Sequence, residues 1–318
     1  MSDSSPTVVV TCLQMQDYLA EALPSSQLKE ELSFHFPPLR GQQFSASEMA
    51  DHLLSADYAI VGDDVITSES VSDSSIKGLI KWGIGYDSID VEALENKGIR
   101  FSNTPGQFGP DIAELVLGMI LALERGISSV DSGVRAGEWP KFRGSRIKGK
   151  KALILGFGNL GREVARLLTS VKIHCGACDP YAVDLSTTTV TRVQSQFPYD
   201  DQCDYLISCL PLTPETQGFI STRELSVLGS TGFLINVSRG GVVDEAALYS
   251  AISKGAIAGA ALDVYAEEPL GLDSELRNLT GVVFGAHNGS NTEQGVREAS
   301  EVALEILLGW LASEGDTS

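Results

Sequence analysis

The sequence predicts an α/β fold with two parallel sheets, each covered by helices on both faces. Short β-branched runs alternate with polar, helix-like stretches along most of the chain, which is the pattern of βαβ units. The chain has 318 residues, about twice the usual size of one domain, so two such units fit. Hydrophobic residues make up 43% and charged residues 20%, which is ordinary globular usage.

The first sheet is predicted within the first hundred residues, with strands at 7–12, 58–62, 78–82 and 99–103. The stretch 111–126 is apolar all round, which predicts a helix buried between domains or between subunits. The segment 132–150 is rich in glycine and basic residues and lacks sustained periodicity, as expected for an arm or linker.

A second alternating series predicts a complete doubly wound sheet. Its strands are expected at 151–156, 172–179, 204–211, 232–238, 256–264 and 282–286. The last stretch, 292–311, has the pattern of one amphipathic helix.

The charge balance excludes several classes of partner. A net charge of −19 and a pI near 4.5 give a surface that repels phosphate backbones and anionic lipid, so neither nucleic acid nor a membrane is expected as a partner. No stretch reaches about 18 consecutive apolar residues, and the N-terminus lacks a basic leader, which predicts a cytoplasmic protein.

The five cysteines do not suggest a disulfide framework. Cys175 and Cys178 form a C-x-x-C, a pattern typical of redox centres or of half a zinc site, but they lie within a predicted strand. Residues three apart on a strand point to opposite faces. We therefore expect buried structural thiols and no metal site.

A glycine motif after the first strand of the second sheet predicts a dinucleotide site. Gly156, Gly158 and Gly161 form G-x-G-x-x-G between an apolar strand and a helical pattern. The first glycine permits a tight turn, the second lets a pyrophosphate approach the backbone, and the third lets the helix pack on the strand. The helix N–H groups of Asn159 and Leu160 would then face the anion.

This motif also needs an acidic residue about 20 positions later, which bonds the adenosine ribose hydroxyls. Asp179 occupies that place, and a carboxylate there repels a 2′-phosphate. No arginine follows within 179–184, DPYAVD, so NAD is favoured over NADP as the cofactor. The alternative is an aspartate that merely begins the turn before Pro180.

A nicotinamide enzyme that acts on an alcohol needs an acid–base group near the hydroxyl. Of the four histidines, His287 follows a predicted strand, at the edge where open α/β sheets bind ligands. The other three, His35, His52 and His174, suit packed or solvated positions.

The substrate acid also needs a cation, and the histidine needs a partner. Arg239 follows another strand and could bind a 2-oxo acid through two parallel hydrogen bonds, although a surface arginine is the common alternative. Glu268 precedes Pro269; its carboxylate could orient His287 and favour the protonated imidazole, or it could belong to an ordinary acidic loop.

Together these residues resemble the D-isomer-specific 2-hydroxyacid dehydrogenases, the family of phosphoglycerate, glycerate, D-lactate and formate dehydrogenases. The resemblance runs nearly end to end in the family's order, over KWGIGYDSIDVEALENKGIRFSNTPG, LGFGNLGREVA, CLPLTPETQGFI, LINVSRGGVVDEAAL, GAALDVYAEEP and HNGSNT. It implies an enzyme that transfers hydride between NAD and C2 of a small D-2-hydroxy or 2-oxo acid. Arg239, Glu268 and His287 would be its catalytic residues.

The resemblance also implies a domain division and a dimer. A flavodoxin-like substrate domain would comprise 1–103 and 291–318, and a Rossmann NAD-binding domain would comprise 104–290. The final helix would therefore return to the N-terminal unit. The long helix at 109–126 would lie at a homodimer interface.

Further contacts follow from the same resemblance. Backbone amides of Ile84 and Gly85 would bind the substrate carboxylate, and Asp263 would bond the nicotinamide carboxamide. Additional substrate contacts are expected from Lys81 and Asn103. The remaining predicted cofactor contacts are Leu210, Pro211, Val237, Ser238 and Gly289.

Two departures from the family pattern concern the substrate. The histidine follows Ala286, where the family usually has proline. Lys81 matches a basic position of phosphoglycerate-type members and hints at a phosphorylated acid, or it is a snorkelling strand residue beside Trp82.

Two other functions stay open. Corepressors of the C-terminal-binding type resemble the same family and use NAD(H) to control assembly, and formate or phosphite oxidation also occurs on this scaffold. Glu268 before proline keeps the hydroxyacid pattern.

Overall fold

The computed structural model describes residues 5–23, 28–38, 43–182, 190–191 and 193–315. The chain divides into two compact units, unit 1 with Met1–Gln107 and Asn291–Ser318, and unit 2 with Phe108–Ser290. Residues 183 and 184, the end of the DPYAVD segment, lie outside the described residues.

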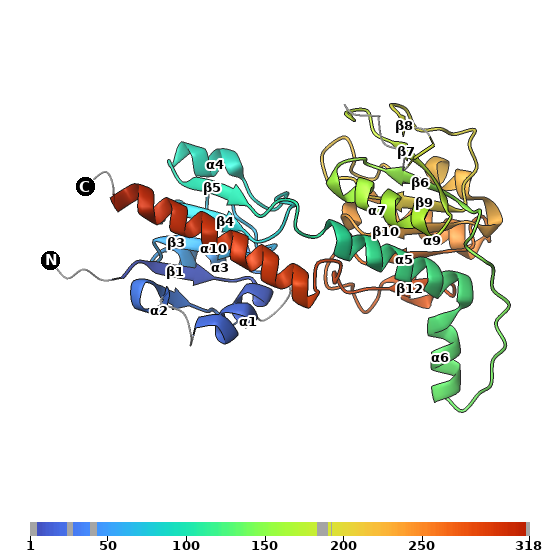
Figure 1. The fold of residues 1–318 in the computed structure, drawn as a ribbon, viewed down its shortest axis with the longest axis horizontal. Coiled ribbons are helices and arrows are strands. Elements are labelled where there is room, and N and C mark those ends of the chain that lie inside the picture. Colours follow the sequence, from blue (N-terminus) through green and yellow to red (C-terminus); the bar gives the residue numbers. More distant parts are fainter. Residues whose placement is uncertain (1–4, 24–27, 39–42, 183–189, 192, 316–318) are drawn as a thin grey trace. The chain divides into compact units, whose positions relative to one another are not determined.

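Unit 1 is built on a five-stranded parallel sheet in the order β2-β1-β3-β4-β5, which is the flavodoxin-like order (Figure 1). The strands are β1 Thr7–Val10, β2 Ser33–His35, β3 Tyr58–Val61, β4 Gly78–Lys81 and β5 Arg100–Asn103. The helices are α1 Leu13–Ala22, α2 Leu28–Glu31, α3 Ala46–Leu53, α4 Val91–Asn96 and α10 Glu293–Gly315.

Both faces of this sheet are covered, which explains why β3 and β4 are buried at every residue and show no alternation of buried and exposed positions. Side chains of α3 and α4 pack with Val9 and Leu79 in one core. The chain's last helix, α10, contacts α1 and β4. Gly78 is glycine because a Cβ there would overlap the ring of Trp310 from α10.

Unit 2 holds a seven-stranded parallel sheet in the order β12-β11-β10-β9-β6-β7-β8, the Rossmann order with a seventh strand. The strands are β6 Lys151–Leu155, β7 His174–Cys178, β8 Val193–Gln194, β9 Tyr205–Ser208, β10 Phe233–Asn236, β11 Gly259–Leu262 and β12 Val282–Phe284. The α-helices are α5 Gly109–Arg125, α6 Ile127–Arg135, α7 Asn159–Ser170, α8 Thr222–Leu225 and α9 Glu245–Ser253. Short 3₁₀ turns lie at Ser226–Thr231, Gly240–Val242 and Glu275–Asn278. The predicted class, two doubly wound parallel-sheet units, is confirmed.

Two cores lie on the two faces of this second sheet. One contains side chains of α5 and α7, and the other contains side chains of α8 and α9. Cys175 belongs to the first core and Cys178 to the second, as expected for residues three apart on a strand. Burial raises the pKa of both thiols to about 11, which keeps them protonated at neutral pH.

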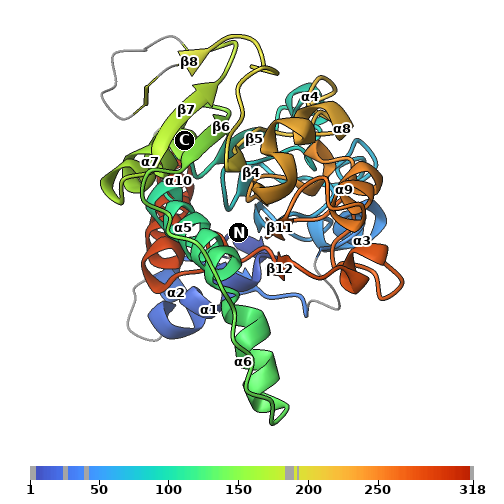
Figure 2. The same cartoon turned by 90° about the vertical axis from the view of Figure 1, so that its right-hand side faces the viewer.

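The structure differs from the sequence prediction at three places. Strands β2 and β8 were not predicted, because edge strands of three and two residues are too short to show periodicity. The first part of the predicted arm is helical, since α6 ends at Arg135. Within unit 2, α6 projects away from the sheet (Figures 1 and 2) and buries none of its residues, so no core-facing pattern revealed it.

No helix among the described residues is long and apolar enough to cross a membrane.

Candidate active site

The residues singled out in unit 2 gather at one edge of its sheet. Each lies in a loop that follows the carboxyl end of a strand: the glycine motif after β6, Asp179 after β7, and Leu210 and Pro211 after β9. Arg239 follows β10, Asp263 and Glu268 follow β11, and His287 follows β12. The strand order reverses between β6 and β9, and open sheets bind ligands at such a reversal.

The glycine motif forms the turn between β6 and α7. Gly156 has φ +85°, which favours glycine, and a Cβ at Gly161 would overlap the Gly156 carbonyl oxygen, so the helix packs directly on the strand end. A Cβ at Gly158 would meet nothing within 4 Å. Helix α7 begins after Gly158 without a side-chain cap or an acidic residue in its first turn. The turn therefore offers backbone N–H groups to an anion.

Asp179 joins this turn to the neighbouring strand end. Its carboxylate accepts hydrogen bonds from the backbone N–H of Phe157 at 2.7 Å and of Tyr181 at 2.8 Å. Asp179 therefore does more than begin the turn before Pro180, because it also holds the glycine turn from the end of the neighbouring strand.

His287 and Glu268 form a direct pair. The imidazole Nδ1 lies 2.7 Å from Glu268 Oε2, and Glu268 Oε1 accepts the backbone N–H of Tyr265 at 2.9 Å. Both side chains are partly buried, with 24% of His287 and 19% of Glu268 exposed. An ionised carboxylate can only accept, so Nδ1 carries the proton of this bond and proton exchange with a substrate falls to Nε2.

The backbone around His287 is held by Asp263. His287 has φ +54°, a left-handed conformation that costs a non-glycine residue about 1 kcal/mol. Its backbone N–H donates to the Asp263 carbonyl at 2.7 Å, and the buried Asp263 carboxylate accepts the N–H groups of Asn288 at 3.1 Å and Gly289 at 2.8 Å. These bonds fix the histidine loop. A contact of Asp263 with nicotinamide stays a prediction.

Arg239 lies in the turn after β10 that Asn236 shapes. The buried Asn236 amide donates to the Arg239 carbonyl at 2.9 Å and accepts the backbone N–H of Ser238 at 3.2 Å. The Arg239 guanidinium donates to the Ser238 carbonyl at 3.1 Å, and the Ser238 hydroxyl lies 2.8 Å from that of Ser208. The guanidinium is thus held against the backbone of its own turn, and the side chain is half-buried.

Tyr265 is a supporting residue that the sequence analysis missed. Its hydroxyl donates to the carbonyls of Gly285 at 2.8 Å and Leu262 at 3.0 Å, which ties the loop after β11 to the loop after β12. Burial, together with the charges of Asp263 and Glu268, raises the pKa of Tyr265 to about 12, so the hydroxyl stays a donor. Tyr265 and Asn236 both lie within the quoted motifs, but no pattern in the neighbouring sequence indicates the hydrogen bonds that their side chains make.

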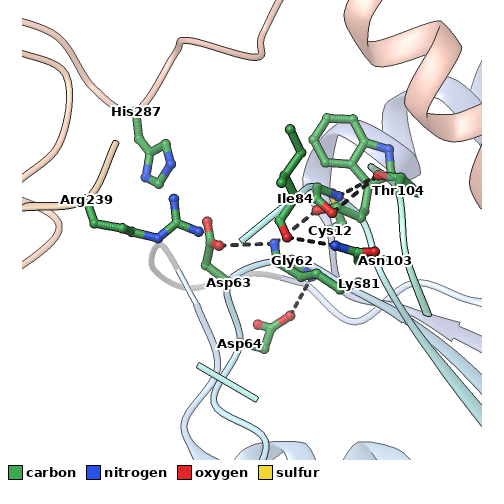
Figure 3. Close-up of polar contacts among 12 residues, drawn as sticks. Cys12, Gly62, Asp63, Asp64, Lys81, Ile84, Asn103, Thr104, Arg239 and His287 are labelled. Carbon is green, nitrogen blue, oxygen red and sulfur yellow. Dashed lines mark hydrogen bonds and ion pairs between the residues drawn. The ribbon is translucent and has the colours of Figure 1, made fainter. Parts of the chain in front are cut away.

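Unit 1 carries the four remaining predicted residues. Ile84 is 40% exposed, Gly85 is partly exposed, and Asn103 donates from its amide to the Ile84 carbonyl at 2.8 Å (Figure 3). Lys81 does not snorkel to solvent. Its side chain is 4% exposed, and its ammonium lies 3.0 Å from Asp63 Oδ1 and donates to the Trp82 carbonyl at 3.0 Å.

Comparison with known proteins identifies the family. The model of the NAD-binding domain of D-isomer specific 2-hydroxyacid dehydrogenases matches residues 117–289. The chain belongs to this family. The resemblance drawn from the motifs is confirmed, and the matched unit is the family's NAD-binding domain.

Two curated relatives show how far the similarity to other family members extends. The chain is 30% identical over 276 residues to the D-3-phosphoglycerate dehydrogenase of Methanocaldococcus jannaschii, covering 83% of this chain and 52% of that protein. It is 33% identical over 256 residues to the glyoxylate reductase of Thermococcus litoralis, covering 75% of each. The match therefore spans about half of the former protein and three quarters of the latter.

Among solved structures, the NAD-dependent formate dehydrogenase of Staphylococcus aureus in complex with NAD is similar with a TM-score of 0.83. The alignment covers 97% of this chain and 96% of that one at 22% identity, which supports the fold alone.

Proposed function

We propose that this family member is an NAD-dependent oxidoreductase that interconverts a small D-2-hydroxy acid and its 2-oxo acid. The observation that carries the proposal is the 2.7 Å bond between His287 Nδ1 and Glu268, at the same sheet edge as the open glycine turn. Acid–base chemistry and dinucleotide binding are the two functions that an alcohol dehydrogenase must combine.

The glycine turn fits the cofactor. The space over Gly158 and the uncapped start of α7 suit a pyrophosphate, with the N–H groups of Asn159 and Leu160 as donors. Asp179, at the end of β7, would accept from the adenosine ribose and repel a 2′-phosphate. Val237, Ser238, Leu210, Pro211 and Gly289, on the loops of the same edge, would line the rest of the cofactor.

The chain's own residues would then transfer the proton and bind the substrate carboxylate. Bound NADH supplies the hydride that reaches C2 of the 2-oxo acid. His287 gives a proton from Nε2 to the carbonyl oxygen while Glu268 holds the ring, and oxidation reverses both transfers. Arg239 binds the carboxylate and polarises the carbonyl, because its planar guanidinium offers two parallel donors. The Ile84 and Gly85 amides are proposed to bind the same carboxylate.

The test is NADH oxidation against glyoxylate, hydroxypyruvate, pyruvate, 2-oxoglutarate and phosphohydroxypyruvate, with the native chain and with His287→Ala. A preferred acid is expected, and His287→Ala should lower kcat by roughly 10²–10⁴ while NADH binding stays near normal. His174→Ala, which removes an exposed histidine of the same unit, is the matched control and should retain full turnover.

Unchanged turnover in His287→Ala would remove that residue from the proposed role. No reduction of any acid by a chain that binds NADH would overturn the enzymatic proposal and favour a sensor of the corepressor kind.

We also propose that the chain works as a homodimer. Around α6 the arm exposes large apolar side chains, with Ile127 53%, Trp139 76% and Phe142 52% exposed. Large apolar side chains exposed close together in the chain are typical of protein interfaces.

A further inference from the structure

The turn after β10 and the loop after β11 pack directly on each other within unit 2. The two strands are parallel neighbours, and the turn carries Arg239 while the loop carries Glu268. A Cβ at Gly240 would overlap the carbonyl group of Tyr265 and the nitrogen of Ala266, so only glycine fits against this peptide without displacing it. The peptide between Tyr265 and Ala266 is therefore where the two segments meet.

A side chain of the next helix also bonds this peptide. Glu245 is the first residue of α9, and its Oε1 accepts the Ala266 N–H at 2.8 Å. Asp244, the N-cap of α9, fixes the start of the helix, because its carboxylate accepts the Ala247 N–H at 3.0 Å and the Ser221 hydroxyl at 3.0 Å. These two bonds, that of Ala247 first, lower the pKa of Asp244, so the cap stays ionised at neutral pH.

Consecutive N–H groups of the loop therefore bind two different carboxylates. The Tyr265 N–H donates to Glu268 Oε1 at 2.9 Å, which leaves Oε2 for His287, and the Ala266 N–H donates to Glu245. Ala266 is exposed, so this side of the loop depends on hydrogen bonds more than on burial. Without its acceptor, the Ala266 N–H would be an unpaired donor close to Glu268 and would compete with His287 for the carboxylate.

We propose that Glu245 is a positioning residue for the acid–base pair of His287 and Glu268. By accepting the Ala266 N–H, it keeps the carboxylate of that pair directed at the imidazole. The inference rests on the proposed function, in which this imidazole exchanges a proton with the substrate. Glu245 acts through its reach and its acceptor oxygen, because a backbone N–H needs an acceptor at hydrogen-bond distance and not a charge.

The alternative role of Glu245 is a general one. An acidic residue in the first turn of a helix is stabilising through its charge, whatever loop lies beside it. The two roles differ in what the side chain must keep, the acceptor at its present reach or the negative charge.

Two conservative variants separate these roles. Glu245→Gln keeps an acceptor at the same reach without the charge, whereas Glu245→Asp keeps the charge but is one methylene too short for the Ala266 N–H. Glu245→Asp should lower kcat for the preferred 2-oxo acid at least about 10-fold, with NADH binding and the thermal unfolding temperature near the native values. Glu245→Gln should keep kcat within about 2-fold. Glu92→Asp, the same shortening at an exposed first-turn acid of α4, is the matched control and should leave kcat unchanged.

Two further readouts follow the pair itself. The proton that His287 Nδ1 shares with a carboxylate should give a far-downfield proton NMR resonance, identified by its absence in His287→Ala. This resonance should be lost or moved upfield in Glu245→Asp and kept in Glu245→Gln, and it needs no turnover. The pH above which reduction slows should also fall in Glu245→Asp, because a weaker bond to the ionised Glu268 disfavours the protonated imidazole.

Native kcat and an unchanged resonance in Glu245→Asp would overturn the inference, as would equal losses in Glu245→Asp and Glu245→Gln. If Glu245→Asp does not fold, Glu245→Ser, which also lacks the reach, takes its place with the same expected losses. A native chain that reduces no acid, while its resonance still depends on Glu245, overturns only the proposed reaction.

Discussion

At the scale of single residues, the second and third glycines of the nucleotide motif have different physical roles. A Cβ at Gly161 would overlap the Gly156 carbonyl oxygen, whereas a Cβ at Gly158 would meet nothing, and Gly158 has φ −77°, which alanine tolerates. Gly158→Ala should therefore fold normally but bind NADH at least about tenfold more weakly, because the methyl group takes the place of the pyrophosphate. NADH fluorescence titration and thermal unfolding measure the two effects.

Gly161→Ala is the contrasting variant, since its methyl group displaces backbone and should lower the free energy of unfolding by about 1–3 kcal/mol. A Gly158→Ala chain that binds NADH as tightly as the native chain would show that no part of the cofactor crosses this glycine.

At the scale of elements, the final helix is fastened to the sheet of unit 1 by one carboxylate. Glu314 of α10 accepts the Tyr58 hydroxyl at 2.7 Å and the Lys77 ammonium at 2.9 Å, and Arg100 lies 3.5 Å away. Lys77 above all, with Tyr58 and Arg100, lowers the pKa of Glu314 below its usual value. A group with a lowered folded-state pKa stabilises the fold above its unfolded pKa, and that contribution is lost as the pH falls through the folded pKa.

Glu314→Gln should therefore lower the free energy of unfolding by about 1–2 kcal/mol at pH 7, and the difference from the native chain should shrink as the pH falls below about 4. Urea unfolding at several pH values measures this. Glu305→Gln, an exposed carboxylate on the same helix, is the control and should change little. If Glu314→Gln lowers the free energy of unfolding by the same amount at every pH, packing and not the charge fastens the helix.

At the scale of the whole molecule, the arm that leaves unit 2 is anchored at its base and exposes several large apolar side chains among its basic residues. The buried Glu124 of α5 accepts the Tyr205 hydroxyl at 2.8 Å and pairs with Lys150, where the arm returns. Such anchoring presents Trp139 and its neighbours at a fixed position, as a homodimer interface requires.

Trp139→Asp should weaken self-association at least about 30-fold, since exposed aromatic residues are frequent interface hot spots. Sedimentation velocity across a concentration series measures it. Leu272→Asp, which changes an apolar residue that is 92% exposed outside the arm, is the matched control. Because each copy carries a net charge of −19, raising the salt concentration should strengthen association of the native chain. Monomers at all concentrations would contradict the dimer.

Local sequence signals were sufficient for the fold class and for the place of most candidate residues at the strand ends of unit 2. Apolar runs with helix-like stretches between them set the two sheets, since buried parallel strands need such runs. The spacing of Gly156, Gly158 and Gly161 predicted the turn, because each glycine meets a constraint within a few residues of chain. His287 could be chosen among the histidines because it follows a strand, and parallel sheets bind ligands at the carboxyl ends of their strands.

The remaining features depend on contacts between residues distant in the chain. Lys81 and Asp63 pair across two strands in register, and Asp263 fixes the loop of His287 from the neighbouring strand end. Neither contact produces a periodic pattern in the sequence, because strand register, burial and side-chain direction are decided only when the sheet assembles. That is why the sequence left open whether Lys81 contacts a phosphate or snorkels to solvent, whereas the fold shows a buried ammonium paired with Asp63.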